Sequence, residues 1–249
     1  MKLRQCVFVA RDLESSTTEL CDILGLEVAY RDPHVAKWGL ANVVCPTGHD
    51  FLEIVSPTRD GTSAGRYLDR RKGDGGYMVI LQTANAEAER KRVTGLGIRA
   101  VEQKDLPDYK YTHFHPADTA GVLLSIDQTI APDGVEPGLW WPPAEKDWLK
   151  HARKDVTYGL AGVEIQSEDP DKTAELWSRI LNRPAEGDII RLVDGQIRFV
   201  PIADDRGPGI SAFDVRVTDR ERVIAAAKKH HKAHGSGQVE ICGCRINLV

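Results

Sequence analysis

The sequence predicts an α+β fold built from four modules, each with one strand, one helix and up to three further strands (βαβββ). Four times, a short apolar segment runs into an Asp or Asn residue and is followed by a helical pattern. These residues are Asp12, Asn85, Asp169 and Asp219. Their side-chain oxygens suit a helix N-cap because they accept hydrogen bonds from the free N–H groups of the first turn. The 249 residues are enough for two domains.

Composition indicates a soluble globular protein and limits the classes of partner. The chain is 41% hydrophobic and 28% charged, and its net charge is −4 without a long basic run, so we expect no nucleic-acid partner. The apolar stretch over residues 6–10 is too short for a signal-peptide core or a membrane span. Five scattered cysteines favour reduced thiols. We therefore expect a cytoplasmic monomer or homodimer with a small-molecule ligand and no membrane partner.

The first two modules occupy the first half of the chain. In module one we expect a strand over 3–10 and a helix over 13–24 that stops at Gly25, since glycine readily takes the left-handed conformation that ends helices. Its remaining strands are predicted over 26–30, 38–45 and 51–55. Module two is predicted as a strand over 78–82, a helix over 86–96 and strands over 99–102, 110–114 and 122–126. A short helix over about 64–72 lies between the modules.

Two shorter modules follow. Module three is predicted as a strand over 162–166, a helix from Asp169-Pro170 to about 181, and strands over 189–192 and 197–202. Proline suits the first helical position because no N–H is needed there. Module four is predicted as a strand over 212–217, a helix over 220–231, and strands over 239–242 and 245–249.

A connector over residues 131–156 separates the predicted first domain (1–130) from the second (157–249). It is rich in proline and tryptophan, with Pro132, Pro137, Pro142, Pro143, Trp140, Trp141 and Trp148. Proline density favours an extended segment, and tryptophans indicate that the segment is packed against something. We expect a strap between domains; a lid over a pocket is the alternative.

The strand over 51–55 contains one acidic residue in apolar surroundings. Phe51, Glu53 and Val55 share one face of the strand, and Leu52 and Ile54 share the other. A buried, unpaired carboxylate costs several kcal/mol, or its pKa rises until it becomes neutral. We therefore expect a metal, a cation, a hydrogen-bond network or a substrate to contact Glu53.

Four βαβββ units paired into two halves resemble the vicinal oxygen chelate superfamily, which includes glyoxalase I, methylmalonyl-CoA epimerase, extradiol dioxygenases and bleomycin-resistance proteins. The matching segments are residues 9–16 (VARDLESS), 23–26 (ILGL), 51–54 (FLEI) and 115–124 (HPADTAGVLL), the last similar to the epimerase branch. The resemblance covers nearly the whole chain. It implies two glyoxalase-like domains, each curled into a cup.

The resemblance also implies a divalent metal (Zn, Ni, Mn or Fe) bound by the first and last strands of each unit. In module one these places hold Gln5 and Glu53. In module two they hold Met78, beside Tyr77, and Ser125, and a thioether is a poor ligand for a hard cation. Only half of the implied site is thus present. The matching places in the second half are Gly162, Phe199, Ala212 and Asn247, so we expect a metal-free second domain.

Two functions remain open. The first is a lyase or isomerase of the glyoxalase or epimerase kind, with Glu53 as general base and Gln5 orienting it or a metal. Tyr111, His113 and His115 share one strand face and would line the substrate together with Ser125. The second is a non-catalytic protein that sequesters a drug or metabolite, in which Trp38, Tyr77 and Tyr111 stack on a flat ligand. Arg66, Arg70 and Arg71 are interpreted as ordinary exposed charge, with binding of an anionic group as the alternative.

Overall fold

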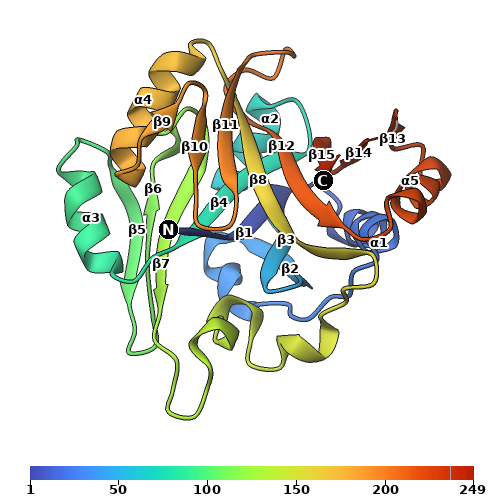
Figure 1. The fold of residues 1–249 in the computed structure, drawn as a ribbon, viewed down its shortest axis with the longest axis horizontal. Helices are drawn as coiled ribbons and strands as arrows, with labels where there is room; N and C mark the ends of the chain where they lie inside the picture. Colours follow the sequence, from blue (N-terminus) through green and yellow to red (C-terminus); the bar gives the residue numbers. More distant parts are fainter. Residues whose placement is uncertain (236) are drawn as a thin grey trace.

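The protein consists of two mixed β-sheets with helices around their edges (Figure 1). The structure is a computed structural model that describes residues 1–235 and 237–249. Within these residues, no helix combines the length and apolar character needed to cross a membrane. The predicted α+β fold of four modules, paired into two glyoxalase-like sheets, is confirmed.

The first sheet contains modules one and two, with strand order β2-β3-β1-β4-β7-β6-β5. Its strands are β1 (Lys2–Val9), β2 (Leu40–Thr47), β3 (Asp50–Pro57), β4 (Gly75–Gln82), β5 (Ala100–Asp105), β6 (Tyr109–Phe114) and β7 (Leu123–Thr129). The central strands β1 and β4 are antiparallel, while β3 runs parallel to β1 and β7 runs parallel to β4. Adjacent modules therefore pair around an internal two-fold relation.

The second sheet contains modules three and four, with strand order β13-β14-β15-β12-β8-β11-β10-β9. Its strands are β8 (Thr157–Ser167), β9 (Ala185–Glu186), β10 (Ile189–Arg191), β11 (Gln196–Pro201), β12 (Gly209–Val217), β13 (Ala233–His234), β14 (Gln238–Ile241) and β15 (Cys244–Leu248). The very short strands β9 and β13 were not predicted, because two residues leave no alternating pattern in the sequence.

All but one of the helices in the described residues begin at a predicted cap, and the helix over 63–70 follows Thr62 instead. The helices are α1 (Leu13–Leu24), α2 (Ser63–Arg70), α3 (Ala86–Thr94), α4 (Pro170–Leu181) and α5 (Arg220–Lys229). The side chains of Asp12, Asn85, Asp169 and Asp219 each accept a hydrogen bond from the backbone N–H three residues later. Gly25 ends α1 with φ of 65°, and a Cβ there would lie 2.7 Å from Val156 Cγ2, so both conformation and space require glycine.

One predicted strand is absent, and its neighbour begins later than expected. Residues 26–30 form no strand, and only Tyr30 makes an isolated bridge to Val44. Asp32 then caps a 3₁₀ helix, η1 (Pro33–Trp38), whose first residue has no N–H to give to a sheet. Trp38 therefore ends this helix instead of starting a strand, and β2 begins at Leu40.

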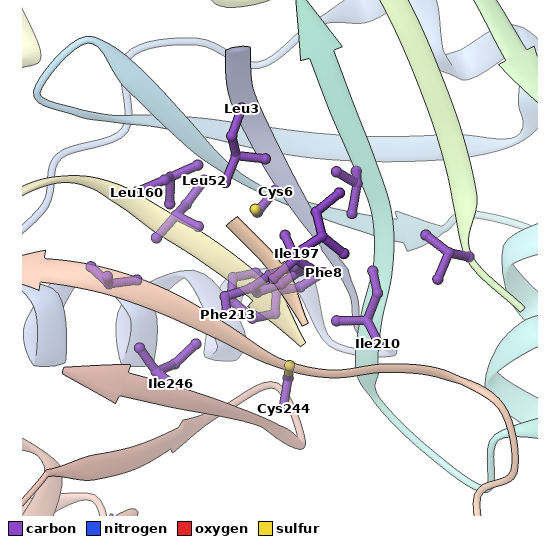
Figure 2. Packing of buried hydrophobic residues seen from close by; sticks show 14 of the residues in the cluster. Leu3, Cys6, Phe8, Leu52, Leu160, Ile197, Ile210, Phe213, Cys244 and Ile246 are labelled. Carbon is purple, nitrogen blue, oxygen red and sulfur yellow. The ribbon is translucent and has the colours of Figure 1, made fainter. Parts of the chain in front are cut away.

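The two sheets pack face to face on one hydrophobic core. Figure 2 shows Leu3, Cys6 and Phe8 of β1 meeting residues of the second sheet, among them Phe213. The rings of Phe8 and Phe213 lie 5.0 Å apart, edge to face. Leu52 and Ile54 of β3 belong to this core, whereas Phe51 and Val55 pack on the opposite face of the sheet, as the sequence predicted.

The connector lies against that opposite face of the first sheet. It contains three 3₁₀ turns, η3 (Pro137–Leu139), η4 (Pro142–Ala144) and η5 (Trp148–His151). In Figure 1 it runs, in yellow-green, past β2. Trp141 stacks on Phe51 with ring centroids 6.0 Å apart, and Trp148 meets the same ring edge-on at 5.0 Å. Both indoles are buried, so the expectation that this segment is packed is confirmed.

Candidate functional site

A cavity of about 770 Å³ lies on the face of the first sheet that points away from the shared core. Its walls come from the central strands, from β6, from α2 and η1, and from Pro142 and Pro143 of the connector. Eight of the nine site residues predicted from the sequence line it, namely Gln5, Trp38, Glu53, Tyr77, Met78, Tyr111, His113 and His115. The connector thus contributes one wall of the pocket.

Glu53 is a buried carboxyl group in the wall of the cavity that β1 and β3 form. Its side chain belongs to β3 and the residue is 8% exposed. One carboxylate oxygen accepts a hydrogen bond from Gln5 Nε2 at 2.6 Å, and the other accepts one from Asn42 Nδ2 at 2.6 Å. The partner that the sequence required for Glu53 is therefore a pair of side-chain amides from the two neighbouring strands.

The orientation of Gln5 is fixed by the connector. Trp141 Nε1 donates a hydrogen bond to Gln5 Oε1 at 2.8 Å. An indole N–H can only donate, so the amide must turn its oxygen towards Trp141 and its N–H₂ towards Glu53. A chain of hydrogen bonds therefore runs from Trp141 through Gln5 to Glu53, and it joins residues that lie 136 positions apart.

Burial raises the pKa of Glu53 to about 7, and hydrogen bonds from Asn42 and Gln5 limit the rise. Removal from water disfavours the carboxylate, whereas N–H donors favour it. The result is a carboxyl group that exchanges its proton near neutral pH. Perturbed pKa values of this kind in a cavity are typical of general acids and bases.

A divalent metal does not fit the donors at the implied positions. Gln5 Oε1 accepts from Trp141, and both oxygens of Glu53 accept from amides. In module two, Met78 offers a thioether and Ser125 directs its hydroxyl to Asp127. Within residues 1–235 and 237–249, no three His, Cys, Asp or Glu side chains gather in a way that could hold a metal ion. The donor chemistry thus favours a hydrogen-bonded carboxylate over a metal ligand.

Tyr77 and Met78 both line the cavity although they are adjacent in sequence. Val7 of β1 pairs with Met78 and Phe8 pairs with Gly76, so the register shifts between them and Tyr77 is the extra residue. A β-bulge of this kind redirects a side chain that would otherwise point to the other face. The bulge therefore lets both neighbours at this place, Met78 and Tyr77, reach the cavity.

An aromatic wall contains the predicted stacking residues. The rings of Tyr111 and His113 are stacked with centroids 4.7 Å apart, and Trp38 lies 6.2 Å from His113. Burial lowers the pKa of His113 to about 4, so its imidazole is neutral near pH 7. Lys37 covers the ring of Trp38 at 3.9 Å and pairs with Glu102. This wall presents flat, neutral surfaces to the cavity.

Two of the predicted site residues, His115 and Ser125, form hydrogen bonds within the protein. His115 Nδ1 accepts a hydrogen bond from Ala117 N–H and so caps a 3₁₀ turn, η2 (Pro116–Asp118), although the residue also borders the cavity. Ser125 is buried and does not line the cavity, since its hydroxyl donates to Asp127 on the same strand. Ser125 is thus not among the residues that line the cavity, and its predicted contact with a substrate stays a prediction.

The three arginines that the sequence left as exposed charge divide into two groups. Arg66 and Arg70 of α2 are exposed but line the cavity, where Arg66 also donates to Gly61 O and Arg70 lies 5.2 Å from the Tyr67 ring. Arg71 is only 2% exposed and donates to backbone carbonyls that lead into β12, among them Pro208 O at 2.9 Å. Arg71 therefore joins the two sheets and does not serve the cavity.

Among the residues that sequence reasoning missed are Asn42 and Trp141, which bond to Glu53 and Gln5, and Tyr109, which lines the cavity and donates to the buried Asp127. Asn42 stands within an apolar strand pattern and Asp127 ends another, and these positions were the available signals. Trp141 could not be placed, because nothing in the periodicity of the connector relates it to Gln5.

The corresponding face of the second sheet holds an open, polar hollow of about 740 Å³. Asp214 there accepts from Asn247 at 2.7 Å and forms an ion pair with Arg198. A Cβ on Gly162 would lie 2.6 Å from Asp214 Oδ2, so glycine leaves room for this carboxylate. The two hollows thus differ in chemistry, since one is aromatic around a buried acid and the other is filled by paired charges.

Comparison with known proteins supports the fold. A family model described as a glyoxalase-like domain matches residues 6–181. A mutant of 4-hydroxymandelate synthase from Streptomyces coelicolor has 15% identity and a TM-score of 0.68, and the match covers 93% of this chain and 75% of that one. A hypothetical protein from Staphylococcus aureus has 14% identity and a TM-score of 0.68, over 100% and 98% of the two chains.

A smaller protein matches about half of the chain. A mutant of methylmalonyl-CoA epimerase from Streptomyces coelicolor, in complex with 2-nitronate-propionyl-CoA, has 20% identity and a TM-score of 0.47, over 53% of this chain and 99% of that one. A search of curated proteins found no significant match.

Proposed function

Because the chain belongs to the glyoxalase-like domain family of the vicinal oxygen chelate superfamily, we propose that it is an enzyme that moves a proton on a small organic carbonyl compound. In this proposal the compound binds in the cavity of the first sheet and Glu53 is the general base. The reaction belongs to the isomerase or lyase class. One observation carries the proposal: a buried carboxylate in the cavity, held by two amides, with a pKa raised to about 7.

The surroundings of Glu53 meet two requirements of a general base: sufficient strength, and ionisation at neutral pH. A carboxylate with an ordinary pKa is too weak to remove a proton from carbon efficiently, and a fully desolvated one would stay protonated. Burial strengthens Glu53 as a base, while the donors on Gln5 and Asn42 keep a useful fraction ionised at neutral pH. The two amides also hold both carboxylate oxygens in a fixed orientation.

The cavity walls support a flat, anionic carbonyl compound as substrate. The rings of Trp38, Tyr111 and His113 offer stacking surfaces. Arg66 and Arg70 line the α2 side, and a guanidinium binds a carboxylate through two parallel hydrogen bonds. A volume of about 770 Å³ suits a small organic molecule.

The same aromatic wall favours a second candidate function, the sequestration of a flat ligand without chemistry. Stacked rings next to a neutral imidazole bind such ligands whether or not a proton moves. The two functions differ in whether the ligand is returned unchanged.

Deuterium exchange tests the first function directly, because it follows the proton transfer alone and does not require a complete reaction. We expect the protein to exchange the C–H protons next to the ketone of 2-oxo-4-phenylbutanoate in D₂O, followed by proton NMR. Two matched compounds separate the contacts: 4-phenylbutan-2-one lacks the carboxylate and 2-oxobutanoate lacks the ring. Both compounds should exchange more slowly. The first loses its contact with Arg66 and Arg70, and the second loses its contact with the aromatic wall.

Glu53→Gln provides the decisive variant. It preserves the size of the side chain and removes the base, so we expect exchange to fall by about a hundredfold or more. Unchanged exchange in this variant would disprove the role of Glu53. Binding of all three compounds without exchange, detected as a rise in melting temperature, would instead support sequestration.

A further inference from the structure

A second buried carboxyl group lies behind the wall of the same cavity and has no part in the scheme above. Asp127 of β7 has no exposed surface, and it accepts hydrogen bonds from the hydroxyls of Ser125 and Tyr109. Burial raises the pKa of Asp127 to about 7, and the two hydroxyls limit this rise. Within the described part of the chain, no charged side chain contributes to the shift. The carboxyl group is therefore held by neutral donors alone.

Tyr109 connects Asp127 to the cavity. It belongs to β6 and lines the cavity, and its hydroxyl is bonded to Asp127. Its ring lies 5.9 Å from Trp141, the residue that orients Gln5, and 5.5 Å from Tyr111. Burial raises the pKa of Tyr109, and the charges of Asp127 and Glu53 raise it further. Glu53 and Tyr109 thus line the same cavity from opposite sides of the central strands β1 and β4, and Asp127 reaches it only through Tyr109.

We infer that Tyr109 and Asp127 form the acid partner of Glu53, with Tyr109 donating a proton to the carbonyl oxygen of the substrate and Asp127 replacing it. This inference rests on the proposed function, and it assigns Tyr109 as a catalytic residue and Asp127 as the residue that acts through it. Ser125, which the sequence placed against the substrate, becomes a positioning residue for Asp127.

The proton transfers balance without any further reactant. Glu53 takes the proton from the carbon beside the carbonyl, and the electron pair of that C–H bond forms a C=C bond while the carbonyl oxygen gains negative charge. The Tyr109 O–H proton passes to this oxygen, and the carboxylic proton of Asp127 passes to Tyr109. The products are a neutral enol, a protonated Glu53 and an ionised Asp127. Return of the protons in reverse order restores the enzyme.

The arrangement requires Asp127 to be protonated when Glu53 is ionised. A protonated Asp127 donates to the Tyr109 oxygen, which leaves the phenolic hydrogen free to point to the substrate. An ionised Asp127 instead accepts from Tyr109 and removes that donor from the cavity. Tyr111 from β6 and Ser125 from β7 contact the pair, and the charge of Glu53 on β3 acts on Tyr109 across the cavity. Exchange should therefore require an ionised Glu53 and a protonated Asp127 at the same time.

The test is the pH profile of exchange into 2-oxo-4-phenylbutanoate, from about pH 5 to about pH 9. The wild type should give a bell-shaped profile, limited by ionisation of Glu53 on the acid side and of Asp127 on the alkaline side. Asp127→Asn keeps a donor to Tyr109 but cannot transfer a proton, so it should lower the maximum about a hundredfold and abolish the alkaline decline. Tyr109→Phe should lower the maximum to a similar extent and also abolish the alkaline decline, because Asp127 acts only through the Tyr109 hydroxyl.

Controls separate this inference from the proposed function. Tyr158→Phe removes a hydroxyl from the exposed side of the second sheet and should leave exchange unchanged. Exchange that depends on Glu53 but is unaffected in Tyr109→Phe and Asp127→Asn would overturn this inference alone. No exchange by the wild type would contradict the proposed function and this inference together. If Asp127→Asn fails to fold, Tyr109→Phe decides, since it retains the ring packing.

Discussion

At the scale of single residues, the central feature is a carboxyl group that the fold places away from water. The alternation of β3 alone predicted that Glu53 shares a face with Phe51 and Val55, and that something must offset its burial. The structure supplies Gln5 and Asn42, and both are amides. Neutral donors stabilise a carboxylate less than a cation does, so the pKa of Glu53 stays near 7 where an ion pair would have lowered it.

This shift predicts how stability depends on pH. Burial raises the pKa of Glu53 from 4.5 to about 7, so the folded state holds the proton more tightly than the unfolded chain does. The associated stabilisation is fully present below about pH 4.5 and is lost as pH rises through about 7. Glu53→Gln has no such loss. Its free energy of unfolding relative to wild type should therefore increase by about 3 kcal/mol between about pH 4.5 and about pH 8.

Urea denaturation of both proteins at several pH values measures this difference. Groups that titrate identically in the two proteins, including Asp127, cancel when their free energies of unfolding are subtracted. A difference that stays constant with pH would show that the pKa of Glu53 is ordinary.

At the scale of elements, the sequence predicted helices better than it predicted irregular segments. The bounds of α1 and the caps of α1, α3, α4 and α5 follow from local chemistry, because a capping side chain and its N–H partner lie three residues apart. The segment over 26–30 has a strand-like composition. It makes only the bridge from Tyr30 to Val44, and the chain then enters η1 at the Asp32 cap. Tertiary geometry therefore overrode local preference there.

The same distinction holds for the site. Glu53 and the face of β6 could be found from the two-residue period of a strand, whereas Gln5 was indicated by the resemblance to the superfamily. Trp141 and Asn42 could not be assigned, since their roles depend on which strands become neighbours and on where the connector returns. The connector links the two sheets and also lines the cavity with Pro142 and Pro143, while its action as a lid stays a prediction.

Trp141→Phe tests the link between the connector and the base. Phenylalanine retains stacking on Phe51 but loses the N–H that orients Gln5. We expect a loss of about 1 kcal/mol in the free energy of unfolding, typical of one hydrogen bond, and a further rise in the pKa of Glu53 as Gln5 becomes free to turn.

The neighbouring residue provides the matched control. Trp140 is half-buried, and its indole N–H has no hydrogen-bond partner within the described residues. Trp140→Phe should therefore leave the pKa of Glu53 unchanged. Equal effects of the two substitutions on that pKa would contradict the role of Trp141.

At the scale of the whole molecule, two similar sheets share one core but differ on their outer faces. The strands of the first sheet end at Thr129 and those of the second begin at Thr157, close to the predicted ranges 1–130 and 157–249. The shared core and the contacts of Arg71 and Arg206 with the opposite sheet bind the two halves together. The matched family region, 6–181, also crosses from one sheet into the other. Whether each range is an independent domain stays a prediction.

This architecture explains why only one face carries the proposed chemistry. One face of each sheet is buried in the shared core, so only the outer faces are available to ligands. On the second sheet, ion pairs such as that between Arg198 and Asp214 occupy the hollow. On the first sheet, the connector closes one side and leaves Glu53 and Tyr109 in a single cavity.

The most direct test of the central claim is a pH titration of the Glu53 carboxyl group by NMR. The protein would be labelled with ¹³C at its glutamate carboxyl carbons, and the Glu53 signal would be assigned by its absence in Glu53→Gln. The structure predicts a midpoint near pH 7. A midpoint near the ordinary value of 4.5 would contradict the claim that the cavity holds a base poised for proton transfer at neutral pH.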